Sequence, residues 1–70
     1  MSEHTYAITH VVGTSTSSVD DAIRNGIRKA GESLRNLDWF VVKEIRGSLQ
    51  HTTEVQHVQV TMEIGFRYED

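Results

Sequence analysis

The absence of cysteine from a chain of only 70 residues is the feature that most limits how this protein can become stable. A domain of this size buries only about 60% of the surface that its extended chain exposes, so its core is thin. Small domains usually compensate with disulfides, a metal or a partner subunit. Because disulfides are excluded here, association of the chain with itself is the favoured source of additional stability.

Charge and hydropathy exclude several classes of protein. The formal net charge is -3 and the basic residues are scattered, whereas nucleic-acid binding depends on clustered lysine and arginine. The sequence has no apolar run long enough to span a membrane and no basic segment followed by an apolar core. We therefore expect a soluble, cytoplasmic protein without nucleic-acid or membrane partners, folded as one domain over residues 1–70.

Hydrophobic periodicity predicts three strands and one helix. The strands are expected at about residues 4–12, 39–49 and 55–68, and Gly13 is expected to end the first of them. The helix should begin after a Ser/Thr segment whose last hydroxyls can cap it, and it should stop at Asn36. Residues 50–54 are expected to form a hairpin loop.

The predicted helix carries one apolar stripe, whose members recur at three- and four-residue steps. These members are Val19, Ala22, Ile23, Gly26, Ile27, Ala30 and Leu34. A glycine inside a helix costs about 1 kcal/mol relative to alanine. We therefore expect another element to pack closely against the helix backbone at Gly26 and at Gly31.

The expected fold is α+β, with the order β-α-β-β and the helix lying on one face of a three-stranded antiparallel sheet. The third strand alternates sharply, with Val58, Val60, Met62, Ile64 and Phe66 on one face. The second strand is apolar on both faces. Because neighbours in a strand point to opposite faces, either Trp39 or Phe40 should point away from the helix. Such an exposed face is an interface or a ligand site.

Most of the residues that could take part in catalysis or metal binding have structural explanations. The four histidines lack the spacing of a metal-chelating pair, and the Ser/Thr segment after Gly13 does not match a nucleophile elbow. We therefore expect no catalytic residue and no metal. Trp39 either packs in a core or subunit contact, or offers its flat π surface to a planar ligand.

Five short motifs, in this order and spacing, resemble the bacterial type of the dodecin family over nearly the whole chain. They are Val12-Gly13-Thr14-Ser15, Leu37-Asp38-Trp39-Phe40, Glu44-Ile45-Arg46-Gly47, Gln59-Val60 and Gly65-Phe66-Arg67. The resemblance implies a homododecamer, a hollow shell in which the sheet of each subunit partly wraps its helix. This agrees with the self-association that the small size favours independently.

The resemblance also implies binding of flavins in pairs. Trp39 matches the residue that stacks on the isoalloxazine ring, which gives an indole–flavin–flavin–indole sandwich on a two-fold axis. Gln59 matches the residue that hydrogen-bonds the polar edge of the flavin, and Asp38 and Arg46 match its neighbours. Two structural alternatives stay open beside these roles: Gln59 as a solvated strand residue, and Arg46 as an ion-pair partner between subunits.

Some bacterial dodecins bind a second ligand, a coenzyme A-like nucleotide. The matching positions are Lys29, Ser33, Leu34, Arg35, Arg67 and Glu69. The resemblance thus implies a non-enzymatic protein that stores and sequesters flavin mononucleotide (FMN), riboflavin or lumichrome and limits flavin photochemistry. The alternatives are a structural or carrier assembly that binds coenzyme A-like nucleotides, and a flavin-dependent redox enzyme.

Overall fold

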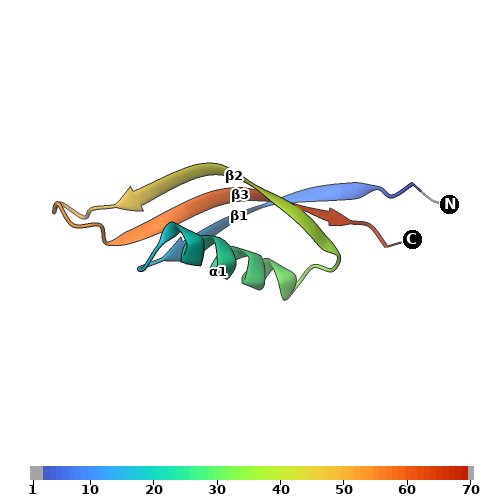
Figure 1. Cartoon of the computed structure of the whole chain (residues 1–70), viewed down its shortest axis with the longest axis horizontal. Helices are drawn as coiled ribbons and strands as arrows, with labels where there is room; N and C mark the ends of the chain where they lie inside the picture. The colour runs from blue at the N-terminus through green and yellow to red at the C-terminus, as the bar shows by residue number, and fades with distance from the viewer. Residues whose placement is uncertain (1–2, 70) are drawn as a thin grey trace.

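The structure, a computed structural model, describes residues 3–69 and confirms the predicted order of strands and helix (Figure 1). The elements are β1 (Tyr6–Ser15), α1 (Val19–Gly31), β2 (Leu37–Ser48) and β3 (His57–Arg67). The strands form one antiparallel sheet in the order β1-β3-β2, so β3 is the central strand. The sheet is long and curved, and α1 lies along one of its faces.

The core lies between α1 and the helix-facing side of the central strand. Val60, Met62 and Ile64 of β3 are almost completely buried, together with Ala22 of α1. The three β3 residues alternate along the strand, so the predicted two-faced character of this strand is confirmed. Because α1 packs on β1 and β3, β2 is left largely uncovered on the helix side.

Gly13 does not end the first strand, and that prediction is wrong. β1 continues through Gly13 to Ser15. A Cβ atom at Gly13 would overlap the carbonyl oxygen of Ala22 and lie 3.1 Å from the amide nitrogen of Gly26. The glycine is therefore the point where the strand backbone touches the helix backbone, and it does not mark a turn.

Gly26 makes the matching contact from the helix, as predicted. A Cβ atom there would lie 2.7 Å from Cε of Met62 and 3.2 Å from Cα of Gly13. The same expectation for Gly31 is wrong, because the nearest atom to a Cβ built there is Cδ1 of Leu37 at 3.7 Å. That distance is an ordinary van der Waals contact.

The helix begins at its predicted cap and ends earlier than predicted. The Ser18 hydroxyl accepts a hydrogen bond from the backbone N–H of Asp21 at 3.1 Å. At the other end, Glu32 is the C-cap, and Leu34 lies beyond the helix. Asn36, expected as the stop, instead has a φ of 62° in the turn that leads into β2. Asparagine tolerates this left-handed conformation better than most residues.

The connection between β2 and β3 is longer than predicted and spans residues 49–56. It contains no glycine, and the left-handed positions are taken by Gln50 with a φ of 48° and His51 with a φ of 66°. β3 accordingly begins at His57, two residues later than the expected start at residue 55. Within residues 3–69, no helix is long and apolar enough to cross a membrane.

Replacing the helix cap by Ser18→Ala is expected to lower the free energy of unfolding by about 1 kcal/mol, because the Asp21 amide loses its acceptor. Chemical denaturation at a fixed protein concentration measures this loss. The matched control is Ser17→Ala, since Ser17 bonds through its backbone N–H, which the substitution retains. An equal loss in both variants would contradict the assignment of Ser18 as the cap.

Candidate functional site

The sheet face opposite α1, called here the outer face, carries most of the predicted flavin-site residues. The cross-strand register pairs Trp39 with Gly65 and Arg46 with Gln59. These positions alternate with the buried residues of β3, so they lie on the side away from the helix. Large exposed hydrophobic side chains share this face, as predicted: Tyr6, Ile8, Val12, Trp39 and Val41.

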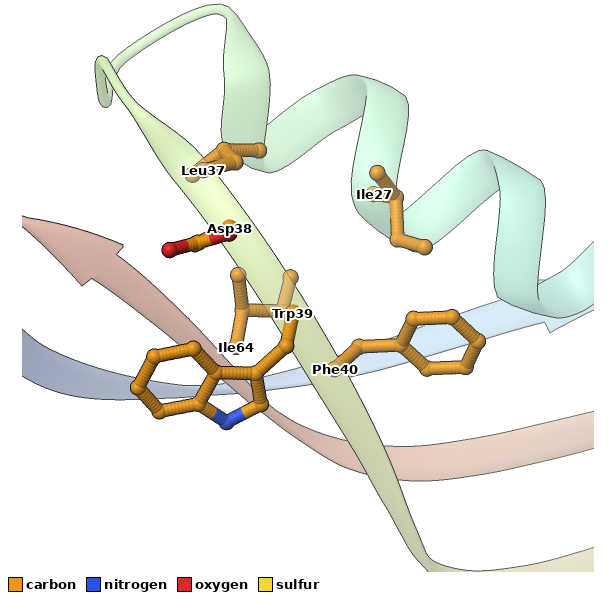
Figure 2. Close-up of a pocket in the computed structure, with 6 residues that line it drawn as sticks. All are labelled: Ile27, Leu37, Asp38, Trp39, Phe40 and Ile64. Atoms are coloured by element: carbon orange, nitrogen blue, oxygen red, sulfur yellow. The ribbon is translucent and has the colours of Figure 1, made fainter.

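Trp39 and Phe40 point in opposite directions from β2, as Figure 2 shows, and this confirms the predicted alternation. Phe40 is paired with Ile64 on the helix side, whereas Trp39 is paired with Gly65 on the outer face. The residue that points away from the helix is therefore the tryptophan. This resolves which of the two rings is available on the outer face.

The indole of Trp39 lies flat on the backbone of the central strand. A Cβ atom built at Gly65 would overlap three atoms of the indole, namely Cε2, Cζ2 and Cδ2, the last of them at 2.6 Å. Several ring atoms at similar distance mean that a face of the ring, rather than its edge, is turned toward Gly65. The side chain of Trp39 is nevertheless 40% exposed. One face of the indole is thus covered, and the opposite face is open.

Asp38 is the extra residue of a bulge in β2, since the register shifts between Leu37 and Trp39. It is exposed and lines a small, mainly apolar pocket of about 160 Å³, to which α1 contributes Ile27 (Figure 2). It also lines a more polar hollow that includes Arg67. The bulge therefore turns a carboxylate outward directly beside the indole.

At the other end of the outer face, Arg46 and Gln59 are hydrogen-bonded. The Arg46 Nε donates to Gln59 Oε1 at 2.8 Å. This bond engages the amide oxygen of Gln59 and leaves its NH₂ group as a donor for another partner. Arg46 is exposed and Gln59 is half-buried, so both side chains are accessible from the outer face.

The structure does not bring Trp39 and Gln59 together within one chain. Their β3 register positions, Gly65 and Gln59, are six residues apart, which corresponds to about 20 Å along a strand. The two side chains therefore belong to opposite ends of the outer face of one chain.

The predicted nucleotide-binding residues divide into two groups. Five of the six line one surface hollow of about 420 Å³, together with Asn36, Phe66 and Tyr68. These five are Ser33, Leu34, Arg35, Arg67 and Glu69. The sixth, Lys29, lies apart on α1, where its Nζ is 3.3 Å from Oε1 of Glu32.

Charged groups are also paired on both sides of the sheet. His10 and Glu63, a cross-strand pair near the middle of the outer face, are 3.2 Å apart. The hydrogen bond that Arg24 donates to Asp20, supported by the charge of that carboxylate, raises the pKa of Arg24, but α1 is on the opposite side of the sheet. Within residues 3–69, no group of three or more histidine or acidic side chains could hold a metal ion.

Two residues of the site were missed by the sequence analysis, namely Gly65 and Tyr6. The Tyr6 ring lies 5.2 Å from the Trp39 ring, centroid to centroid, at an interplanar angle of 55°. A glycine within a strand often marks close approach by another group, and this signal could have pointed to Gly65. Nothing in the local sequence around Tyr6 indicates its contact with Trp39.

Fold and site together define a small α+β protein that presents aromatic surface on the uncovered face of its sheet. Comparison with known proteins identifies the family. The family model for dodecins matches residues 5–69. A dodecin from Thermus thermophilus is 43% identical over 65 residues, which are 93% of each chain.

Solved structures agree with this match. Dodecin from Streptomyces davaonensis superposes with a TM-score of 0.93 at 54% identity, over 99% of this chain and 100% of that one. Dodecin from Streptomyces coelicolor superposes with a TM-score of 0.92 at 48% identity, over 100% and 99% of the two chains. The chain belongs to the dodecin family.

Proposed function

We propose that this protein binds flavins without catalysing a reaction on them, and that it stores and sequesters FMN, riboflavin or lumichrome. The observation that carries the proposal is the indole of Trp39, which lies flat on Gly65 with its opposite face open. A flat aromatic surface held in this way is suited to a flat aromatic ligand. Membership of the dodecin family supports the same function.

Stacking supplies the main binding energy in this proposal. Stacking of a base on an aromatic side chain contributes about 1–3 kcal/mol per ring, which is the scale we expect for a flavin on the indole. Because the indole already rests on the sheet, little side-chain ordering is required when the ligand binds. The stacked indole also quenches the excited flavin, which limits its photochemistry.

A second copy of the chain completes the proposed site. The backbone positions of Trp39 and Gln59 are about 20 Å apart along the strands of one chain. In the proposed site, a two-fold axis brings Trp39 of one subunit toward the partner's Gln59. A two-fold contact is self-complementary, so two flavins would be sandwiched between two indoles. Arg46 would hold the amide of Gln59 and meet the ribityl chain or phosphate. The proposed full assembly is a homododecamer, in which the same two-fold contact is repeated.

The sandwich argues against a redox enzyme as the alternative. A flavin covered on one face by an indole and on the other by a second flavin has no open position for a substrate to approach its ring. Oxidation of a reduced nicotinamide at a catalytic rate, measured with the flavin-loaded protein, would overturn the non-enzymatic assignment.

A coenzyme A-like nucleotide is the second candidate ligand, and one specific observation favours it. The hollow that contains Ser33, Arg35 and Arg67 combines cationic and hydroxyl groups with the aromatic rings of Phe66 and Tyr68. Cations suit phosphates and aromatic rings suit an adenine base. Lys29, the sixth predicted residue, lies outside this hollow, and its part in nucleotide binding stays a prediction. Calorimetric titration with coenzyme A tests this candidate.

The direct test of flavin binding is a titration of riboflavin and of FMN with the protein, followed by flavin emission. The proposal predicts saturable quenching. Unchanged emission, with a protein that elutes as an intact assembly, would contradict it and would favour the structural or carrier alternative. Coenzyme A would then be titrated into the same preparation.

Gln59→Ala is expected to weaken riboflavin binding about fivefold, because one hydrogen bond of about 1 kcal/mol is lost. Quenching of the bound flavin should persist, since the stacking partner is unchanged. Gln56→Ala is the matched control, because its side chain contacts Thr52 in the β2–β3 connection, away from the indole. Equal affinities for the two variants would remove Gln59 from the site.

A further inference from the structure

The contact between Tyr6 and Trp39 joins the two edge strands of the sheet. Trp39 belongs to β2 and Tyr6 to β1, and the central strand β3 runs between them. Their rings are nevertheless only 5.2 Å apart between centroids. The indole therefore extends from its own strand across β3 and reaches the far strand.

Gly65 makes this crossing feasible. It is the register partner of Trp39 on one side and of Ile8 on the other. Any side chain at Gly65 would occupy the space where the indole now lies, as the overlap of its hypothetical Cβ with the ring shows. The strand backbone thus sets how close the indole lies to the sheet, but a flat backbone does not fix the lateral position of the ring.

Tyr6 provides a second contact to the indole. Its ring meets the indole at 55°, a tilted arrangement that aromatic pairs favour over face-to-face stacking. Tyr6 is 40% exposed, like Trp39, so the pair lies on the surface outside the main core.

We propose that Tyr6 is a positioning residue, which holds the Trp39 indole flat on Gly65 so that one ring face is presented to a planar ligand. The orientation of the indole is a property of the chain itself. The effect on ligand affinity rests on the proposed flavin-binding function. A tryptophan held in this way offers a single face, so each indole accepts one flavin ring.

Two independent measurements test the role of Tyr6 in the assembled protein. The first is near-ultraviolet circular dichroism without ligand, read in the long-wavelength indole bands. The chain has one tryptophan, so these bands report on Trp39 alone. The second is the affinity for riboflavin, measured by emission.

Tyr6→Ala is expected to lose at least about half of the indole dichroism and to bind riboflavin about three- to tenfold more weakly, the range that corresponds to loss of an aromatic pair. Tyr6→Phe should restore both properties, because the ring and not the hydroxyl makes the contact. The matched control is Tyr68→Ala, which removes a tyrosine that pairs with Phe66 at 6.4 Å. That variant should retain the indole bands.

Parent-like dichroism and affinity in Tyr6→Ala would overturn the proposal, and so would failure of Tyr6→Phe to restore them. If Tyr6→Ala does not assemble, Tyr6→Leu retains bulk without an aromatic ring and is read by the same criteria. Absence of riboflavin binding by the parent protein would contradict the proposed function alone. The comparison of ligand-free dichroism would still decide whether Tyr6 positions the indole.

Discussion

Replacing Trp39 with alanine is expected to abolish flavin quenching and to weaken riboflavin binding by about five- to 150-fold, because the flavin loses a stacking contact of about 1–3 kcal/mol. The indole is also the proposed quencher, so emission of any bound flavin should recover. The fold should survive, since Trp39 is outside the buried cluster of Ala22, Val60, Met62 and Ile64. Titration of riboflavin with the variant measures both effects.

The graded variant Trp39→Phe separates stacking from simple occupancy of the site. Phenylalanine retains an aromatic face over Gly65 but offers less area than an indole, so its affinity should fall between those of the parent and of Trp39→Ala. If Trp39→Ala quenched riboflavin as strongly as the parent, Trp39 would not be the stacking residue. Size-exclusion chromatography of each variant verifies that assembly is unchanged.

The second large effect is expected from Gly13→Ala, which should lower the free energy of unfolding by about 3 kcal/mol or more, at the upper end of the cost of overpacking. The added Cβ would overlap the carbonyl oxygen of Ala22 and crowd the backbone nitrogen of Gly26. Both are backbone atoms of α1, so relief requires the helix to move away from the sheet. Thermal unfolding followed by far-ultraviolet circular dichroism measures the loss.

Gly31→Ala, at the end of the helix against which Gly13 packs, is the matched control. A Cβ atom there meets nothing nearer than Leu37 Cδ1 at 3.7 Å, and alanine is favoured over glycine in a helix by about 1 kcal/mol. This variant should be as stable as the parent or more stable. Equal unfolding temperatures for Gly13→Ala and the parent would contradict the close contact between strand and helix.

The fold was largely predictable because the helix and the third strand have clear, different periodicities. Val60, Met62 and Ile64 alternate along β3, and they are the hydrophobic residues of this strand found buried. Gly13 was misinterpreted because a glycine within an apolar strand has the same local signature whether it ends the strand or admits a helix. Only the packing of α1 against β1 distinguishes the two.

The exposure of one aromatic ring of β2 on the outer face was predictable from the sequence, but the contacts of that ring were not. Opposite directions for Trp39 and Phe40 follow from the two-residue period of any strand. The contacts that Gly65 and Tyr6 make with the indole depend on the register of three strands. The separation of Trp39 from Gln59 depends on the same register. Register is set by pairing between distant segments, and the periodicity of a single segment does not contain it.

The central claim is that a flavin stacks on the open face of Trp39 where two copies of the chain meet. A crystal structure of the protein grown with riboflavin tests it most directly. The account predicts the isoalloxazine ring parallel to the indole, with its polar edge at the partner's Gln59. Riboflavin bound elsewhere, or a Trp39 ring enclosed by its own chain, would contradict it.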